Sequence, residues 1–220
     1  MNASSTCYVS AFLDIGRERW PKCDRTVSSY FKCFSPFVKL FSKNSKDIMI
    51  VYIDDKYFDH FLTLIKGSSI QAIPININFM NNHIFAWSKL AKEREIMNSD
   101  EYRDAFPTRL SYPENTIPEY TLINHSKIDF VNLAMKTCNF NYFCWVDFGF
   151  FQTQQRIPRA LLDIKKLDTT RINYQLLNPI TEKDNDIIYT IDISPERIGG
   201  FSPSVVEIKW LNIKLCIMKP

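Results

Sequence analysis

Glycine is scarce in this sequence, whose 220 residues include five glycines and 17 phenylalanines. Neither G-x-G-x-x-G nor G-x-x-x-x-G-K-[ST] occurs in it. Both motifs use glycine so that backbone N–H groups can approach a phosphate. The sequence therefore argues against the glycine-rich phosphate loops of dinucleotide-binding proteins and P-loop NTPases.

Cysteine pairs and long apolar runs are missing as well. The six cysteines are widely spaced and contain no C-x-x-C pair, so neither a zinc site nor a disulfide framework is indicated. No apolar run approaches the roughly 20 residues of a membrane span, and the N-terminus does not resemble a signal peptide. We therefore expect a cytoplasmic protein without a transmembrane segment.

Blocks of one charge are also lacking. Lysine and arginine number 27 against 24 aspartates and glutamates, which gives a net charge of +3. These residues are scattered along the chain, so we predict no nucleic-acid partner. Hydrophobic residues make up 45% of the chain, which is enough for the buried core of one domain.

Segments typical of strands alternate with segments typical of helices. The predicted strands are Cys7–Leu13, Asp47–Ile53, Ile70–Ile77 (where Pro74 suits an edge strand or a bulge), Tyr142–Val146 and Ile187–Ile193. The predicted helices are Val27–Phe41 with a break near Pro36, Tyr57–Ile65, Ile84–Met97, Asn124–Lys136 and Arg156–Leu167. Asp100–Pro118 is expected to be a long ordered loop, and Val205–Met218 fits a strand or a buried helix. This alternation predicts α/β layers around a mostly parallel sheet.

Acidic residues follow three of the predicted strands. Asp147 and Gly149 end the Tyr142–Val146 strand, and a carboxylate at a strand end either builds a ligand site or caps the turn. Asp14 and Arg17 follow the first strand, where they contact a ligand or pair on the surface. For Asp54 and Asp55 we favour a helix start over a metal site.

Four motifs in order resemble the HtrL/YibB (WlaTC-like) family. They span about residues 7 to 205, and they are Phe12–Arg17 with Trp20, Pro118–Tyr120 with Lys127, Trp145–Gly149, and Gly199–Phe201. The resemblance implies a GT-A-type glycosyltransferase, a Rossmann-related fold, over a single domain of residues 1–220. Its substrates would be a nucleotide-sugar donor and a glycan acceptor.

The resemblance also implies roles for individual residues. Asp147 would be the catalytic centre and would hold Mn²⁺ or Mg²⁺ against the donor diphosphate, since a hard cation offsets the charge of the leaving group. The implied donor-binding residues are Asp14, Arg17, Lys127, Gly199 and Gly200.

The sequence departs from the family pattern in two places. Gly149 stands where GT-A enzymes usually have a second acidic residue, and the chain ends about 20 residues after Gly200, which predicts a domain shortened at its C-terminus. The alternative is thus a catalytically inactive GT-A-like binding or scaffold domain. An inverting transferase needs a base, for which Asp192 and Glu196 are candidates. His125 fits a ligand, a base or a structural residue.

A protein kinase is rejected. Asp147-Phe148-Gly149 matches the kinase D-F-G tripeptide, but the sequence has neither an H-R-D motif nor a glycine-rich loop.

Overall fold

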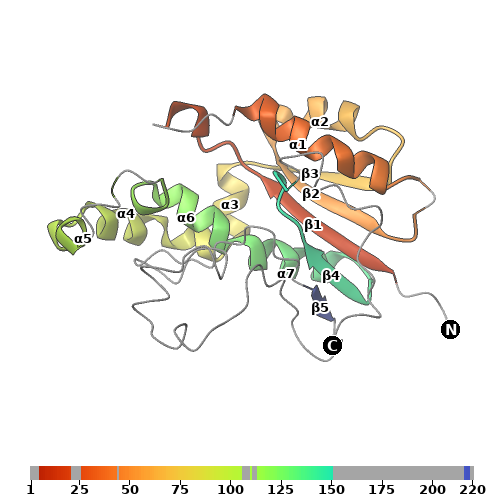
Figure 1. Ribbon diagram of the computed structural model, residues 1–220. Coiled ribbons are helices and arrows are strands. Elements are labelled where there is room, and N and C mark those ends of the chain that lie inside the picture. Colours follow the sequence, from red (N-terminus) through yellow and green to blue (C-terminus); the bar gives the residue numbers. More distant parts are fainter. Residues whose placement is uncertain are drawn as a thin grey trace, which may run out of the picture.

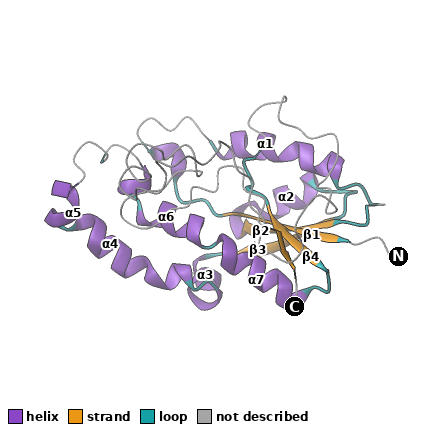
Figure 2. Cartoon of the chain, turned by 60° about the horizontal axis from the view of Figure 1, so that its bottom comes forward, coloured by secondary structure: helices purple, strands orange, loops and turns teal. Residues whose placement is uncertain are grey.

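A five-stranded sheet with helices on both faces forms the centre of the molecule (Figures 1 and 2). The computed structural model describes residues 5–20, 26–43, 45–105, 110, 113–150 and the backbone of 216–218. Four strands are parallel: β1 (Thr6–Phe12), β2 (Ile48–Asp54), β3 (Ile70–Ile75) and β4 (Tyr142–Trp145). The fifth, β5 (Cys216–Met218), runs antiparallel to β4. The predicted α/β class with a mostly parallel sheet is confirmed.

The order of strands in the sheet, β3-β2-β1-β4-β5, reverses direction at β1. Strands β2 and β3 are added successively on one side of β1, whereas β4 pairs with the other side of β1. The chain between β3 and β4 passes through α3 (Ile77–His83), α4 (Leu90–Asn98), α5 (Asp100–Ala105), α6 (Pro118–His125) and α7 (Lys127–Thr137). Such a reversal opens a crevice at the carboxyl ends of the two strands, where α/β proteins commonly bind ligands.

Each face of the sheet is covered by its own helices. Helices α1 (Val27–Leu40) and α2 (Phe58–Leu64) pack on one face, and α3, α6 and α7 pack on the other (Figure 2). Successive residues of β1 alternate between the two sides: Cys7 and Val9 contact the α7 side, and Tyr8 and Phe12 contact the α1 side. Burial on both faces explains why the strands read as continuous apolar runs.

Helix α1 continues through Pro36, so the predicted break is wrong. Proline has no N–H to donate to the carbonyl of Lys32 four residues earlier. The Ser35 hydroxyl donates to that carbonyl instead, at 3.0 Å. Phe34 and Phe37, buried on either side of Pro36, also hold this part of the helix on the sheet.

The segment predicted as a long loop, Asp100–Pro118, contains α5 and a 3-10 helix over Pro113–Asn115. Ser99 starts α5, because its hydroxyl accepts a hydrogen bond from the Tyr102 amide at 3.2 Å. Asp100 and Glu101 in the first turn add favourable charge.

Helix α3 is absent from the sequence prediction, because its sequence continues the apolar run of β3. Asn76 supplies the start signal: its side chain accepts from the Phe79 amide at 3.1 Å. The predicted helix Ile84–Met97 is a 3-10 helix over Ala86–Lys89 followed by α4. Pro74 lies in β3 at the edge of the sheet, as predicted.

The predicted helix Asn124–Lys136 begins later than expected. Asn124 belongs to α6, and α7 starts at Lys127. The Ser126 hydroxyl does not cap α7, because it donates to the Leu122 carbonyl of α6 at 2.7 Å.

Three predicted elements lie wholly or largely outside the described residues. They are the helix Arg156–Leu167, the strand Ile187–Ile193 and all of Val205–Met218 except β5. Among the helices that are described, none has the length and apolar character needed to cross a membrane.

Candidate functional site at the β1–β4 crevice

Asp147 lies directly beyond the carboxyl end of β4. Side chains alternate along the strand, so Asp147 faces the same side as Trp145, toward α7. Trp145 Nε1 donates to Asp147 Oδ1 at 2.8 Å, and Lys127 Nζ lies 2.8 Å from the same oxygen. One carboxylate oxygen therefore accepts both an indole N–H and an ammonium.

Lys127 is the first residue of α7 and belongs to the helix face that packs on the sheet. The buried residues of α7 follow helical spacing: Lys127, Phe130, Val131 and Ala134. Ile128, which the sequence pattern assigns to this apolar face, is 50% exposed. The spacing from Val131 and Ala134 back to Lys127 is the signal that could have identified a buried lysine.

The surroundings of Lys127 require a counter-ion. Its side chain is 8% exposed, and it sits at a helix N-terminus, where the macrodipole disfavours a cation. A buried charge without a partner is strongly destabilising, so Asp147 stabilises Lys127 as much as Lys127 orients Asp147. The ammonium also lies 5.9 Å from the centre of the Trp145 ring.

Asp14 follows β1 and is held by three donors. Its Oδ1 accepts from the Gly16 amide at 2.9 Å, and its Oδ2 accepts from Tyr57 Oη at 2.9 Å and Lys56 Nζ at 3.1 Å. Burial raises the pKa of Asp14, but these bonds from Gly16, Tyr57 and Lys56 outweigh it and hold the pKa below its usual value. Asp14 is therefore an ionised carboxylate at neutral pH.

Asp54 fixes the Asp14 loop to β2. Its Oδ2 accepts from the Asp14 amide and its Oδ1 from the Lys56 amide, both at 3.1 Å. The second bond caps the 3-10 helix Asp55–Tyr57, which confirms the predicted helix start. Gly16, with φ of 74°, lets the chain turn sharply after Asp14.

Arg17 packs among aromatic rings. Its guanidinium carbon lies 5.3 Å from the ring centre of Tyr30 and 5.9 Å from those of Trp20 and Tyr120. Nη1 donates to the Leu13 carbonyl at 3.3 Å, while the buried Nε has no partner among the described residues. The surface pairing of Asp14 with Arg17 is not seen, since Asp14 pairs with Lys56.

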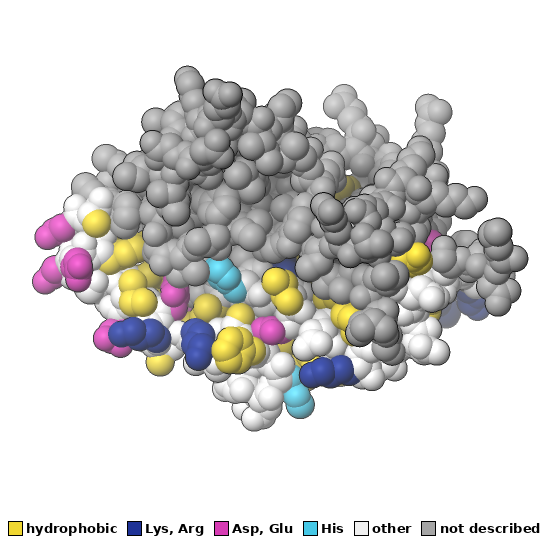
Figure 3. All heavy atoms as spheres, turned by 90° about the horizontal axis from the view of Figure 1, so that it is seen from below, with side chains coloured by type: hydrophobic (Ala, Val, Ile, Leu, Met, Phe, Trp, Pro, Cys, Tyr) yellow, Lys and Arg dark blue, Asp and Glu magenta, His cyan; other side chains and the backbone are white. Residues whose placement is uncertain are grey.

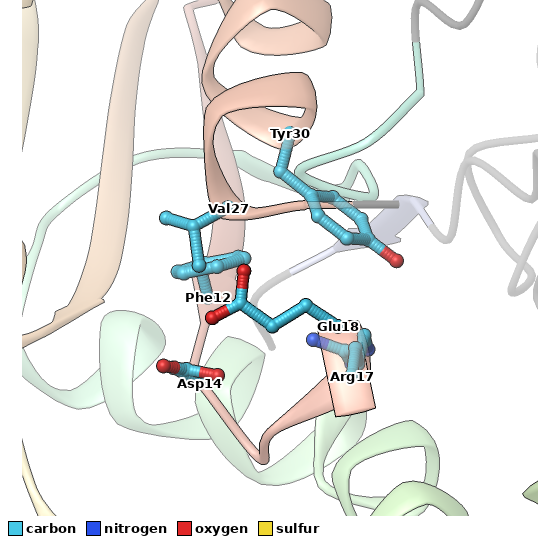
Figure 4. Close-up of a pocket in the computed structure, with 6 residues that line it drawn as sticks. All are labelled: Phe12, Asp14, Arg17, Glu18, Val27 and Tyr30. Carbon is cyan, nitrogen blue, oxygen red and sulfur yellow. The ribbon is translucent and has the colours of Figure 1, made fainter. Parts of the chain in front are cut away.

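A small pocket opens beside this loop (Figure 4). The six residues that line it come from β1, the loop that follows β1, and α1: Phe12, Asp14, Arg17, Glu18, Val27 and Tyr30. In Figure 4 the Glu18 carboxylate extends toward Phe12 and Val27, and Asp14 lies below it. The pocket thus combines two carboxylates and a guanidinium with an apolar wall.

Tyr30 connects the pocket to the Asp147 turn. A Cβ atom on Gly149 would lie 3.0 Å from both Cδ1 and Cε1 of the Tyr30 ring, whereas ordinary van der Waals contacts begin at about 3.4 Å. Arg17 lies over the same ring. The loops after β1 and β4 therefore meet at Tyr30, and a side chain at position 149 requires the ring to move.

The described residues do not by themselves fit a divalent cation. They contain no group of three or more His, Cys, Asp or Glu side chains that could hold one. Asp147 Oδ1 already has two donors, and an acidic residue cannot replace Gly149 without displacing Tyr30. A metal at Asp147 stays a prediction that needs further ligands.

His125 at the end of α6 lies close enough to Lys127 to sense its charge. Burial and, to a smaller extent, the Lys127 charge lower the pKa of His125. Its Nε2 is buried and has no hydrogen-bond partner among the described residues. The imidazole is therefore neutral at pH 7. The other candidates, Gly199, Gly200, Asp192 and Glu196, lie outside the described residues.

Sequence reasoning missed several residues of this site. Trp145 could have been found, because it lies two residues before Asp147 and so shares its strand face. Lys56 and Tyr57 directly follow the acidic pair that is predicted to start a helix. Nothing in the local sequence indicates Tyr30, since its role depends on contacts with two distant loops.

Comparison with known proteins gives two matches. A family described as "Bacterial protein of unknown function (HtrL_YibB)" matches residues 4–188. "Protein HtrL" of Escherichia coli (strain K12) is 29% identical over 157 residues, which are 67% of this chain and 52% of that protein. The chain therefore spans about half the length of the curated relative it matches. No solved structure matches the sequence.

Proposed function

The chain belongs to the HtrL/YibB family, and from the crevice between β1 and β4 we propose that it is a glycosyltransferase of the GT-A type. It would move a sugar from a nucleotide-sugar donor to a hydroxyl of a glycan acceptor. One observation carries the proposal: Asp14 and Arg17 follow β1, and Asp147, paired with Lys127 of α7, follows β4, the strand on the other side of the point where the strand order reverses.

The proposed reaction exchanges one bond of the sugar for another. The bond between the anomeric carbon and the diphosphate oxygen breaks, and its electron pair stays on that oxygen. The acceptor oxygen forms the new bond to the anomeric carbon and loses its proton to a base or to water. The leaving diphosphate gains negative charge, so cations placed beside it lower the barrier.

Two cationic side chains suit the diphosphate on this proposal. Arg17 lines the pocket after β1, and a guanidinium matches phosphate oxygens in pairs. Lys127 lies across the crevice, beyond β4. Asp147 orients Lys127, and it is also the residue on which the family resemblance implies a metal ion.

Thermal unfolding tests the proposal. We expect one of the uridine, guanosine, cytidine and adenosine diphosphates, tested with and without Mn²⁺, to raise Tm. A ligand at 100 times its Kd adds about 2.7 kcal/mol to the free energy of unfolding. Arg17→Gln should abolish the shift. The matched control is Arg103→Gln, on the exposed surface of α5, and it should keep the shift. If no diphosphate shifts Tm at millimolar concentration, the chain has no donor site.

A non-catalytic binding domain is the second candidate. It is favoured by the packing of Gly149 against Tyr30, because a side chain at position 149, where GT-A enzymes usually have a second acidic residue, would press on that ring. Incubation with the nucleotide-sugar of the bound nucleotide separates the two. A transferase releases free nucleoside diphosphate when acceptor is added, whereas a binding domain returns the donor intact.

A further inference from the structure

We infer that the Lys127 ammonium, rather than a divalent metal, is the cation that the Asp147 site presents to the donor diphosphate. The site would then bind nucleotide without metal. This inference rests on the proposed function and specifies how its site works.

Lys127 supplies a cation directly beside Asp147. Its Nζ lies 2.8 Å from Asp147 Oδ1, and the Trp145 indole N–H, also at 2.8 Å, fixes the same oxygen. The ammonium is further held beside the Trp145 ring. On this inference Asp147 orients a protein cation through Oδ1.

Burial makes this cation effective. The Lys127 side chain is 8% exposed, and the attraction between charges increases as water is excluded. Helix α7 fixes the backbone of Lys127, and Phe130 and Val131 anchor that helix in the core. The charge is therefore in place before a ligand arrives, which is the condition for electrostatic stabilisation of a leaving group.

Within the described part of the chain, the carboxylates near Asp147 are not arranged to complete a metal site with it. The Tyr30 ring fills the space that a side chain at position 149 would need. Asp14 is committed to the Gly16 amide, Tyr57 and Lys56. Among the described cations at these strand ends, Lys56 pairs with Asp14, Lys127 pairs with Asp147, and Arg17 lines the pocket after β1. The inference assigns the diphosphate to Lys127, with Arg17 as the second cation.

The test is a calorimetric titration of the full chain with the four nucleoside diphosphates, in EDTA and again in Mn²⁺. We expect Kd in the two buffers to agree within about threefold. Lys127→Gln should raise Kd in EDTA at least about tenfold, because it removes a charge-assisted hydrogen bond to the diphosphate. Lys127→Arg keeps the charge and should stay near the wild type. Lys92 is an exposed lysine on α4, so Lys92→Gln is the matched control and should bind like the wild type.

Two results would overturn the inference while leaving the proposed function intact. One is binding that is at least about tenfold weaker in EDTA than in Mn²⁺ for the wild-type chain. The other is a folded Lys127→Gln variant that binds like the wild type. If Lys127→Gln does not fold, the two-buffer comparison on the wild type decides alone. Absence of binding in both buffers rejects the proposed function itself, and the inference with it.

Discussion

Gly149 illustrates how one residue determines what chemistry the Asp147 turn allows. Its missing side chain leaves space for the Tyr30 ring, which in turn lies beneath the Arg17 guanidinium. The glycine here is explained by close packing, since its φ is not positive. In the described part of the chain, Asp147 is consequently in contact with Lys127 and Trp145.

We predict that Gly149→Asp destabilises the protein by about 1–3 kcal/mol and creates no Mn²⁺ site, because its Cβ overpacks against Tyr30. Urea denaturation measures the loss, and calorimetry with Mn²⁺ measures the binding. Gly149→Ala shares the Cβ atom and should lose a similar amount. A stable Gly149→Asp variant that binds Mn²⁺ would contradict the prediction, because it would show that the Tyr30 ring can move aside at little cost.

Helix α1 shows how an element overcomes an unfavourable residue. Pro36 removes one backbone hydrogen bond, and the Ser35 hydroxyl satisfies the carbonyl of Lys32 that is left over. Phe34 and Phe37 bury their rings against the sheet, and each buried ring contributes roughly 1.5–3 kcal/mol. Tertiary packing therefore outweighs the local cost of the proline.

Pro36→Ala should stabilise the protein by about 1–3 kcal/mol, since it restores the missing amide to a helix that is already formed. Chemical denaturation gives the change. Ser35→Ala, made in the wild type and in the Pro36→Ala variant, is the internal control. It should cost more in the wild type, because the Pro36→Ala variant gives the Lys32 carbonyl a backbone donor. Equal costs would mean that the serine bond does not compensate for the proline.

At the scale of the whole molecule, the described surface residues on one face carry charges of both signs (Figure 3). On the face seen in Figure 3, the described basic, acidic and hydrophobic side chains are interspersed. Some ionisable groups are buried instead of exposed, and burial of such a group makes the stability of the protein depend on pH. Glu93 on α4 is 5% exposed, its Oε1 has no partner among the described residues, and burial raises its pKa above the usual value of about 4.5.

The raised pKa of Glu93 determines the direction in which the stability changes with pH. The native state holds the proton longer than the unfolded state, so its stabilising contribution is complete below pH 4.5 and is lost as pH rises through the folded pKa. Glu93→Gln removes this loss, and its stability relative to wild type should increase from pH 4 to pH 7. Thermal unfolding across that range measures it. The exposed Glu95→Gln is the control, and a pH-independent difference for Glu93→Gln would contradict the prediction.

Most strands and helices, and the position of Asp147 at the end of a strand, could be predicted from the sequence alone. Apolar runs such as Ile48–Ile53 predict buried strands because each side chain of a doubly covered strand must be apolar. The helix start at Asp54 could also be predicted, because aspartate is a common residue before the first turn of a helix. The start of α3, the continuity of α1 and the helix within Asp100–Pro118 could not be predicted, because single hydrogen bonds decide them. The side chains of Asn76 and Ser99 accept from backbone amides, and the Ser35 hydroxyl donates to a carbonyl.

Which strand ends lie next to each other depends on the folded structure as a whole. The sequence does not state that β4 pairs with β1, yet this pairing brings the Asp147 and Asp14 loops to one crevice. The pairing of Lys127 with Asp147 and the contact of Tyr30 with Gly149 likewise join residues far apart in the chain. Local periodicity specifies which face a side chain takes, whereas the neighbour it meets there depends on how the whole core packs.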